Sequence, residues 1–215
     1  MFDFNCDVAQ NCGIYKNDME YEIASYASSI NVAAGFHAGD ALSIKKAFLF
    51  ARENNPTINA HIGYPDMQGF GKRKMNLDDD ELDAVVIYQV SAISAYAQTF
   101  GLEIEGVRLH GALKDELNSN EHTAEVIARA IYHINPWLNL IVQNQKTKDL
   151  VSSIGLKAAL ELEYKDNSIE EIEQMMKDSG IKIDTINFKS VDDIKRAYSV
   201  THPAPVNYNR VGSQI

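Results

Sequence analysis

The sequence predicts a closed barrel of seven parallel β-strands with α-helices around it. Seven strand-like apolar runs alternate with seven segments of helical spacing, with no linker or shift in composition between them. No glycine-rich phosphate-binding loop follows the first strand, which disfavours the open, doubly wound alternative. With 215 residues and 45% apolar content, the chain has the size of one such domain. We therefore predict one barrel domain over residues 1–215, with an extended tail over about residues 200–215.

The predicted strands and helices follow one another in strict alternation. The strand-like runs are residues 2–8, 29–35, 57–62, 104–110, 138–143, 156–162 and 181–188. The segments with helical spacing are residues 19–27, 41–53, 79–100, 122–134, 146–153, 168–178 and 191–198. Asp40 precedes the second of these helices as a cap, the acidic residues 78–81 favour the start of the third, and Gly101 follows its end.

Charge and cysteine content narrow the classes of partner. Lys and Arg number 20 against 30 Asp and Glu, a net charge of −10, which argues against nucleic-acid binding and favours a small-molecule substrate. A disulfide between Cys6 and Cys12 would close a very short loop, so we expect reduced thiols. No signal peptide or membrane-length apolar run is present, so we expect a cytoplasmic protein without membrane contact. The tail could pack on a second copy, which leaves a homo-oligomer open.

Three of the predicted strands deliver a histidine close to a glycine. His37 lies in Gly-Phe-His-Ala-Gly-Asp, His61 precedes Ile-Gly, and His110 precedes Gly-Ala. The carboxyl ends of parallel barrel strands meet at one face, so these imidazoles should converge on one pocket. Each histidine alone is more typical of a buried, hydrogen-bonded core residue, but three at strand ends favour a site. His122, His133 and His202 lie in helical or tail contexts and are expected at the surface.

Asp7, at the end of the first strand, adds a carboxylate to the same rim. Asp7, His61 and His110 form a ligand set that zinc or a similar divalent ion accepts, and the same groups could act as acid–base partners without a metal. His37 is a candidate general base or ligand, and Asp40 could orient its imidazole through a ring N–H. The predicted catalytic residues are Asp7, His37, Asp40, His61 and His110.

The predicted substrate-binding residues are Asn5, Tyr64 and Arg108. Asn5 shares a strand face with Asp7, so it could bond to a substrate carbonyl or hold Asp7, while Cys6 faces away and Asp3 is structural. Arg108 shares a strand face with His110 and could offer a forked cation to a carboxylate or phosphate, or could pair inward with an acidic residue. Tyr64 belongs to the long loop 63–76, which either folds over the barrel mouth as a lid or is an ordinary solvated loop.

These motifs together resemble the LamB/YcsF family, whose members are described as the A subunit of 5-oxoprolinase. The resemblance covers roughly residues 1–145, and the order of its motifs is specific. It implies a seven-stranded β/α barrel like those of glycoside hydrolases and deacetylases. It also implies a hydrolase that takes part in the ATP-dependent opening of the 5-oxoproline lactam to glutamate, with partner subunits B and C. In that scheme the partners would carry out the phosphorylation, and this site would act on the activated cyclic amide.

The sequence departs from the family pattern at several positions. Gln10 stands where the family usually has a glutamate, and residues 108–115 have Arg for Lys and lack the usual tyrosine. Of a later acidic segment only Glu161 remains, and two further family motifs have no counterpart. Three interpretations stay open. They are a divergent member of the 5-oxoprolinase assembly, a metal-dependent amide hydrolase or deacetylase of carbohydrate metabolism, and a non-catalytic binding homologue.

Overall fold

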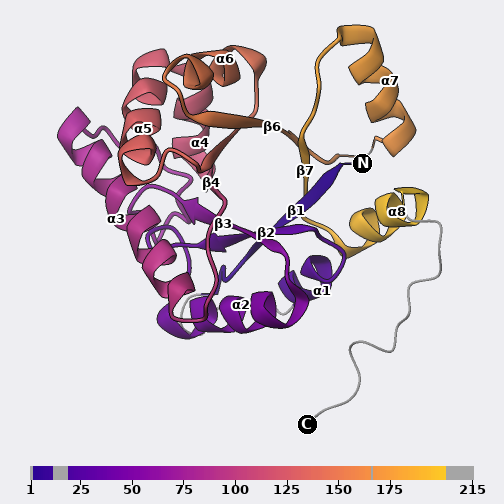
Figure 1. The fold of residues 1–215 in the computed structure, drawn as a ribbon, viewed down its shortest axis with the longest axis horizontal. Helices are drawn as coiled ribbons and strands as arrows, with labels where there is room; N and C mark the ends of the chain where they lie inside the picture. The colour runs from indigo at the N-terminus through magenta and orange to yellow at the C-terminus, as the bar shows by residue number, and fades with distance from the viewer. Residues whose placement is uncertain (1, 12–18, 166, 202–215) are drawn as a thin grey trace.

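The seven strands that the structure describes form one closed, parallel sheet. The computed structural model describes residues 2–11, 19–165 and 167–201, and its strands pair in chain order until β7 closes on β1. Figure 1 shows the strands ringed by helices. The predicted seven-stranded parallel barrel is confirmed. The strands are β1 (Asp3–Val8), β2 (Ser29–Ala33), β3 (Thr57–Ile62), β4 (Gly106–Leu109), β5 (Asn139–Val142), β6 (Lys157–Glu163) and β7 (Thr185–Phe188).

The described residues contain eight helices, one more than predicted. They are α1 (Glu20–Ala24), α2 (Ala41–Asn54), α3 (Asp79–Gln98), α4 (Gly111–Ser119), α5 (Glu121–Ile134), α6 (Gln145–Ser153), α7 (Ile169–Ser179) and α8 (Val191–Thr201). The additional helix is α4, a nine-residue helix that begins shortly after β4 and buries Ala112, Leu113 and Leu117. Asn120 separates it from α5 and caps α5 by accepting from the backbone of His122 and Thr123.

Capping side chains fix where two of the longest helices begin. The carboxylate of Asp40 accepts from the backbone N–H groups of Leu42 and Ser43, and the Ser43 hydroxyl oxygen accepts from the backbone N–H of Asp40. Asp78 and Glu81 make the same reciprocal arrangement at the start of α3. Such boxes satisfy backbone donors that the first helical turn leaves unpaired. Both helix starts agree with the sequence prediction.

The interior of this barrel is polar. Barrels of this type are commonly filled by layers of Val, Ile and Leu. Here asparagines from neighbouring strands bond side chain to side chain: Asn31 donates to Asn5 (2.7 Å), Asn59 donates to Asn31 (3.0 Å) and Asn187 donates to Asn5 (2.7 Å). The apolar core lies instead between the strands and the helices, and it contains the free thiol of Cys6. Alternation along each strand therefore separates a polar interior from an apolar exterior.

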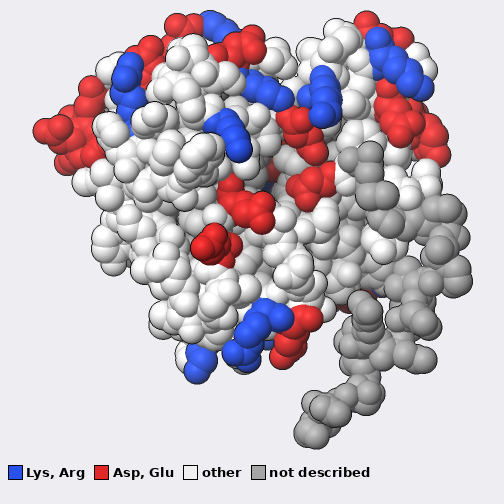
Figure 2. Space-filling view, in the orientation of Figure 1, with Lys and Arg blue, Asp and Glu red and all other residues white. Residues whose placement is uncertain are grey.

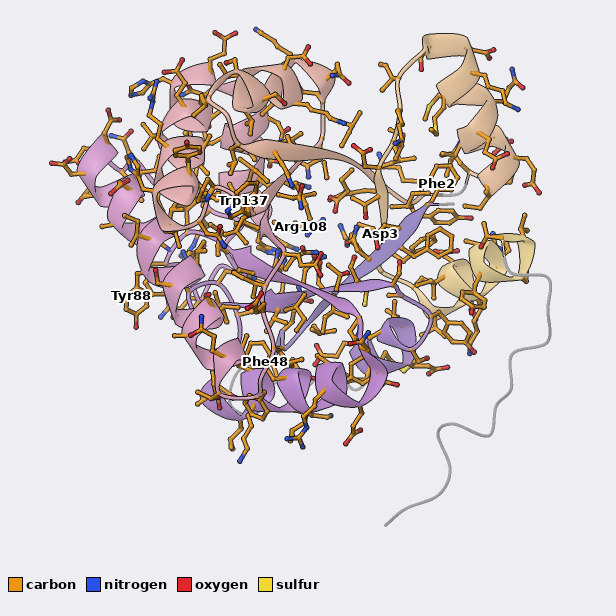
Figure 3. The ribbon with its side chains drawn as sticks, viewed as in Figure 1. Phe2, Asp3, Phe48, Tyr88, Arg108 and Trp137 are labelled. Atoms are coloured by element: carbon orange, nitrogen blue, oxygen red, sulfur yellow. The ribbon has the colours of Figure 1, made fainter. Side chains whose placement is uncertain are left out.

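Arg108 crosses the middle of this interior (Figure 3). Its guanidinium forms a fork with Glu161, with Nε–Oε1 at 2.7 Å and Nη2–Oε2 at 2.9 Å, and Nη1 reaches Asp7 Oδ1 at 3.1 Å. The side chains of Arg108 and Glu161 are 2% and 0% exposed. A buried charge is tolerated when it is paired and hydrogen-bonded, and this arrangement satisfies both conditions. Of the two alternatives for Arg108, the structure shows the inward pair.

Asp3 makes several hydrogen bonds at the amino-terminal end of the barrel. Its carboxylate accepts from the hydroxyls of Ser28, Ser29 and Thr185 at 2.5–2.8 Å. The structural role predicted for Asp3 is therefore confirmed. Cys12, His202 and the predicted tail beyond residue 201 lie outside the described residues. None of the described helices combines the length and apolar character needed to cross a bilayer.

We predict that the Arg108–Glu161 pair holds the barrel together. Replacing Glu161 with alanine leaves a buried guanidinium without its forked partner, which should lower the free energy of unfolding by about 3–5 kcal/mol. Urea denaturation of both proteins measures this change. The matched control is Glu121→Ala, which removes the exposed Glu121–Lys146 pair and should leave stability nearly unchanged. Equal effects of the two substitutions would contradict the prediction.

Candidate functional site

Three histidines meet at the carboxyl-terminal mouth of the barrel. His61 lies in β3, His110 follows β4 directly, and His37 lies in the loop between β2 and α2. One ring nitrogen from each lies within 4.8 Å of the others. The ring of His37 stacks on that of His110 with centroids 4.2 Å apart, and His110 Nδ1 lies 3.2 Å from His61 Nε2. The predicted convergence of the three imidazoles is confirmed.

Burial keeps these imidazoles neutral. His37 and His61 are fully buried, and His110 is mostly buried. Removal from water disfavours the charged form, so burial lowers the pKa of His61 to about 3 and lowers the pKa values of His37 and His110 below their ordinary range. The nearby carboxylate of Asp7 acts in the opposite direction but does not outweigh burial. All three rings are therefore neutral at pH 7.

Neutrality allows us to assign the ring protons of two histidines. His61 Nδ1 faces the backbone carbonyl of Arg108 at 3.2 Å, and His110 Nε2 faces the carbonyl of Phe70 at 2.9 Å. A carbonyl only accepts, so these two nitrogens carry the protons. The remaining nitrogens, His61 Nε2 and His110 Nδ1, then face each other with lone pairs across 3.2 Å. Such a pair of acceptors requires a shared donor or a cation.

Asp7 places a third acceptor beside them. Its Oδ2 lies 3.6 Å from His61 Nε2, while Oδ1 accepts from Asn31 and from Arg108. Burial would raise the pKa of this carboxyl, but the Arg108 guanidinium and the Asn31 hydrogen bond hold it far below its ordinary value. Asp7 is therefore ionised at pH 7. The mouth of the barrel gathers anionic and lone-pair groups around one point.

His37 has an unusual environment for a buried histidine. Neither of its ring nitrogens has a hydrogen-bond partner among the described residues. A buried polar group left unpaired costs about 1–3 kcal/mol. The predicted bond from Asp40 to this ring is wrong, because the Asp40 side chain caps α2 instead. A catalytic role for His37 or Asp40 stays a prediction.

The loop over residues 63–76 packs directly on the histidines. The carbonyl of Phe70 accepts from His110, and the Phe70 ring meets the His110 ring edge-on at 4.9 Å. Gly71 has a φ of +64°, and a Cβ there would lie 2.8 Å from the Cβ of His37. Gly111 has a φ of +54°, and a Cβ there would lie 2.3 Å from the Gly71 carbonyl oxygen. These glycines allow loop and histidines to approach closely, so the loop covers the site as the lid alternative requires.

A pocket of about 510 Å³ opens beside this cluster. Figure 2 shows charged side chains gathered around a hollow in the middle of the face. His110 lines the pocket together with Asp7 and Arg108, whereas His37 and His61 do not line it. The remaining lining residues are Gln10, Glu20, Ile23, Phe70, Lys72, Gly111, Ala112, Lys114, Asp115, Glu163, Phe188 and Lys189. His110 is therefore the imidazole that a ligand reaches first.

Of the three predicted substrate-binding residues, only Arg108 lines the pocket. Asn5 is fully buried, and its amide is bonded to Asn31, Asn187, Thr185 and Glu161, so it supports the barrel interior and not the pocket wall. Tyr64 lies in the core and does not line the pocket. Arg108 lines the pocket, but its donors point to Glu161 and Asp7. The prediction that Asn5 and Tyr64 lie at the substrate pocket is therefore wrong, because neither side chain lines it.

Several residues of the site were not among the predicted ones. Glu161 and Glu163 enter from β6, Asn31 from β2 and Asn187 from β7. The signal was present as polar side chains two positions apart in strand-like runs, as in Glu161-Leu162-Glu163. Glu20 and Lys114 also line the pocket, but they come from α1 and α4, where no strand alternation marks them.

Comparison with known proteins agrees with the fold. The profile of the LamB/YcsF family matches residues 2–185. A protein of Pyrococcus horikoshii, named as the A subunit of 5-oxoprolinase, is 34% identical over 213 residues, which cover 88% of this chain and 83% of that protein. A Bacillus cereus protein of the same name is 45% identical over 138 residues, or 64% of this chain and 54% of that protein. That alignment therefore spans about half the length of the Bacillus relative.

A solved structure has the same fold over nearly the whole chain. The lactam utilization protein from Thermus thermophilus superposes with a TM-score of 0.85 and 25% sequence identity. The alignment covers 94% of this chain and 96% of that protein. The closed barrel is thus an arrangement that an experimentally determined relative shares.

The buried histidines predict how stability depends on pH. Burial lowers the pKa of His61 to about 3 in the folded protein. In the unfolded chain the same imidazole takes up a proton as the pH falls below about 6.5, whereas in the folded protein it stays neutral there. The stabilising contribution is complete above pH 6.5 and is lost as the pH falls toward the folded-state pKa. Between pH 8 and pH 5, this one histidine should lower the free energy of unfolding by about 2 kcal/mol. Urea denaturation at both pH values measures the loss.

The control compares two histidine substitutions. In His61→Gln, the loss between pH 8 and pH 5 should be smaller than in the unmodified protein by about 2 kcal/mol, because the titrating group is gone. His122→Gln, at an exposed position beside Asp79, should retain the loss. An unmodified protein whose stability is independent of pH in this range would refute the assignment of neutral, buried rings.

Proposed function

Because the chain belongs to the LamB/YcsF family, we propose that it acts as the A subunit of a 5-oxoprolinase, a hydrolase that opens the 5-oxoproline lactam to glutamate. The relatives described above carry that name, and the related solved structure is described as a lactam utilization protein. The observation that carries the proposal is the position of His110 and Asp7 on the wall of a pocket that accommodates a small cyclic amide.

The groups at the pocket wall suit hydrolysis of an amide. Water adds to the lactam carbonyl carbon, the bond from that carbon to the ring nitrogen breaks, and the nitrogen takes up a proton. His110 lines the pocket, and its unprotonated Nδ1 can accept the proton of the attacking water. Asp7 stays ionised and stabilises the imidazolium that forms. The protonated ring can then return the proton to the leaving nitrogen.

We propose that ATP is used by partner subunits B and C and not by this chain alone. An amide carbon is a weak electrophile, and phosphorylation of the lactam oxygen would activate it for attack by water. The sequence lacks a glycine-rich phosphate loop after β1. This chain would then bind the activated lactam, and addition of water with cleavage of the carbon–nitrogen bond would leave an acyl phosphate, whose hydrolysis releases glutamate and inorganic phosphate. The buried, free thiol of Cys6 suits a reducing compartment, and we propose the cytoplasm as its location.

The proposal is tested by glutamate release from 5-oxoproline and ATP in the presence of the partner subunits. His110→Ala should lower kcat by about 100-fold or more, as loss of a general acid–base group does. His122→Ala removes an exposed histidine paired with Asp79 and should leave the rate unchanged. Absence of glutamate release by the unmodified assembly would refute the proposal. Release unaffected by His110→Ala would favour a non-catalytic binding role for this chain.

A second candidate is a metal-dependent amide hydrolase, which includes carbohydrate deacetylases. The observation that favours it is the pair of facing lone pairs on His61 and His110, with Asp7 beside them. Their 3.2 Å separation is close to the roughly 3.3 Å that tetrahedral zinc requires of two nitrogens at bonds of about 2.0–2.1 Å. His61 and His110 would hold the ion with Asp7 or His37. When bound, zinc supplies Lewis acidity and an acidic water.

Metal content separates the two candidates. If the lone pairs hold an ion, protein purified without a chelator should contain about one equivalent of zinc or a similar metal, measured by inductively coupled plasma mass spectrometry. His61→Ala should remove it, because one of the facing nitrogens is lost. Protein that contains no metal and binds no added zinc would exclude the metal-dependent candidate and leave acid–base catalysis by the side chains.

A further inference from the structure

The pocket wall carries four cationic side chains, and three of them are engaged. Arg108 is paired with Glu161 and Asp7. Lys114 and Lys189 both approach Glu163, at 2.5 Å and 3.4 Å. Lys72 lines the same pocket, and among the described residues its ammonium makes no ion pair. The ammonium lies instead over the Phe70 ring, 5.7 Å from the ring centroid.

Lys72 differs in this respect from its neighbours in the sequence. Residues 72–74 read Lys-Arg-Lys. Arg73 is bound to Asp66 and Lys74 to Glu116, and neither lines the pocket. An ion pair at the surface contributes little to stability, so pairing alone does not explain three basic residues here. The loop directs two of its cations to acidic partners of the protein and leaves the third at the pocket.

The backbone of the loop holds Lys72 in place beside the histidines. Gly71 accepts from the Ala112 backbone N–H at 2.9 Å, and Lys72 donates its own N–H to Gly69 at 3.0 Å. Phe70 is bound to His110. Because residues 70 and 71 are fixed to the start of α4 and to the site, the Lys72 side chain starts from a defined point on the rim.

The pocket also needs a cation if it is to accept an anionic ligand. Asp7, Glu20, Asp115 and Glu163 line it, and the whole chain has a net charge of −10. The four cations of the pocket wall equal these four carboxylates in number, and three of the cations are already paired with carboxylates. A ligand carboxylate is therefore repelled by the acidic groups unless a cation that is not already paired receives it. 5-Oxoproline carries a carboxylate on the ring carbon next to the lactam nitrogen.

We propose that Lys72 binds the carboxylate of the substrate and so selects lactams that carry an acid group over neutral lactams. This inference rests on the proposed function and names the specificity-determining residue of its pocket. Lys72 binds through its ammonium and places the lactam carbonyl toward His110. The proposed role is one of binding and orientation, and the proton transfers remain with His110 and Asp7.

The test compares three ligands and four proteins by isothermal titration calorimetry on the full chain. The ligands are 5-oxoproline, inorganic phosphate and 2-pyrrolidinone, which is the same lactam without the carboxylate. The unmodified protein should bind 5-oxoproline at least about tenfold more tightly, as a charge-assisted hydrogen bond implies. Lys72→Gln should lose about tenfold in affinity for 5-oxoproline and bind 2-pyrrolidinone as before. Lys72→Arg keeps the charge and should restore most of the affinity.

The matched control is Lys74→Gln, which removes the same charge from the same loop at a position that does not line the pocket. It should leave both affinities unchanged. If 5-oxoproline binds and Lys72→Gln does not weaken it, the inference is wrong while the proposed function stands. If Lys72→Gln weakens only the binding of inorganic phosphate, the cation serves a phosphoryl group and the inference is equally overturned. If the unmodified protein binds neither lactam, the inference is wrong, and the proposed function is decided separately by glutamate release in the presence of the partner subunits.

Discussion

The guanidinium of Arg108 is the interaction on which the rest of the structure depends. A barrel interior filled with asparagine, aspartate and glutamate is costly unless a cation compensates the carboxylates, and Arg108 binds Glu161 and Asp7 at once. The backbone carbonyl of the same residue accepts a hydrogen bond from His61 Nδ1. Arg108 thereby stabilises the fold, keeps Asp7 ionised and sets the orientation of one of the histidines. Both the stability of the barrel and the chemistry of the site therefore depend on the buried charge of Arg108.

The chain assembles its site through close contacts that only small residues allow. Gly71 and Gly111 let the loop over residues 63–76 lie against the histidines, and the Phe70 carbonyl then accepts a hydrogen bond from His110. Water is displaced from His37 and His61 by the same packing, which keeps them neutral. Packing therefore leaves the lone pairs of His61 Nε2 and His110 Nδ1 unprotonated. The contacts that bury the rings also fix which ring nitrogen carries the proton.

The sequence predicted the architecture and the convergence of the histidines, because both follow from the order and spacing of elements. Seven alternations require a parallel sheet, and parallel strands bring His37, His61 and His110 to one mouth. The contacts within the site could not be predicted in this way, because they depend on how side chains pack in three dimensions and not on the spacing of residues in the sequence. Asp40 follows His37 closely in sequence, yet it caps α2, and Tyr64 turns into the core. Helix α4 was not predicted; it has only nine residues, and only His110 separates it from β4.

The chemistry of the site depends on His61 and His110 being neutral, with their ring protons on the nitrogens that face the backbone carbonyls of Arg108 and Phe70. Nitrogen-15 NMR of the imidazole rings, assigned with single histidine variants, reports tautomer and charge directly. We predict that at pH 7 His61 carries its proton on Nδ1 and His110 carries its proton on Nε2, and that the His61 ring stays neutral down to pH 5. A His61 ring that titrates near pH 6.5, or opposite tautomers on the two rings, would contradict it.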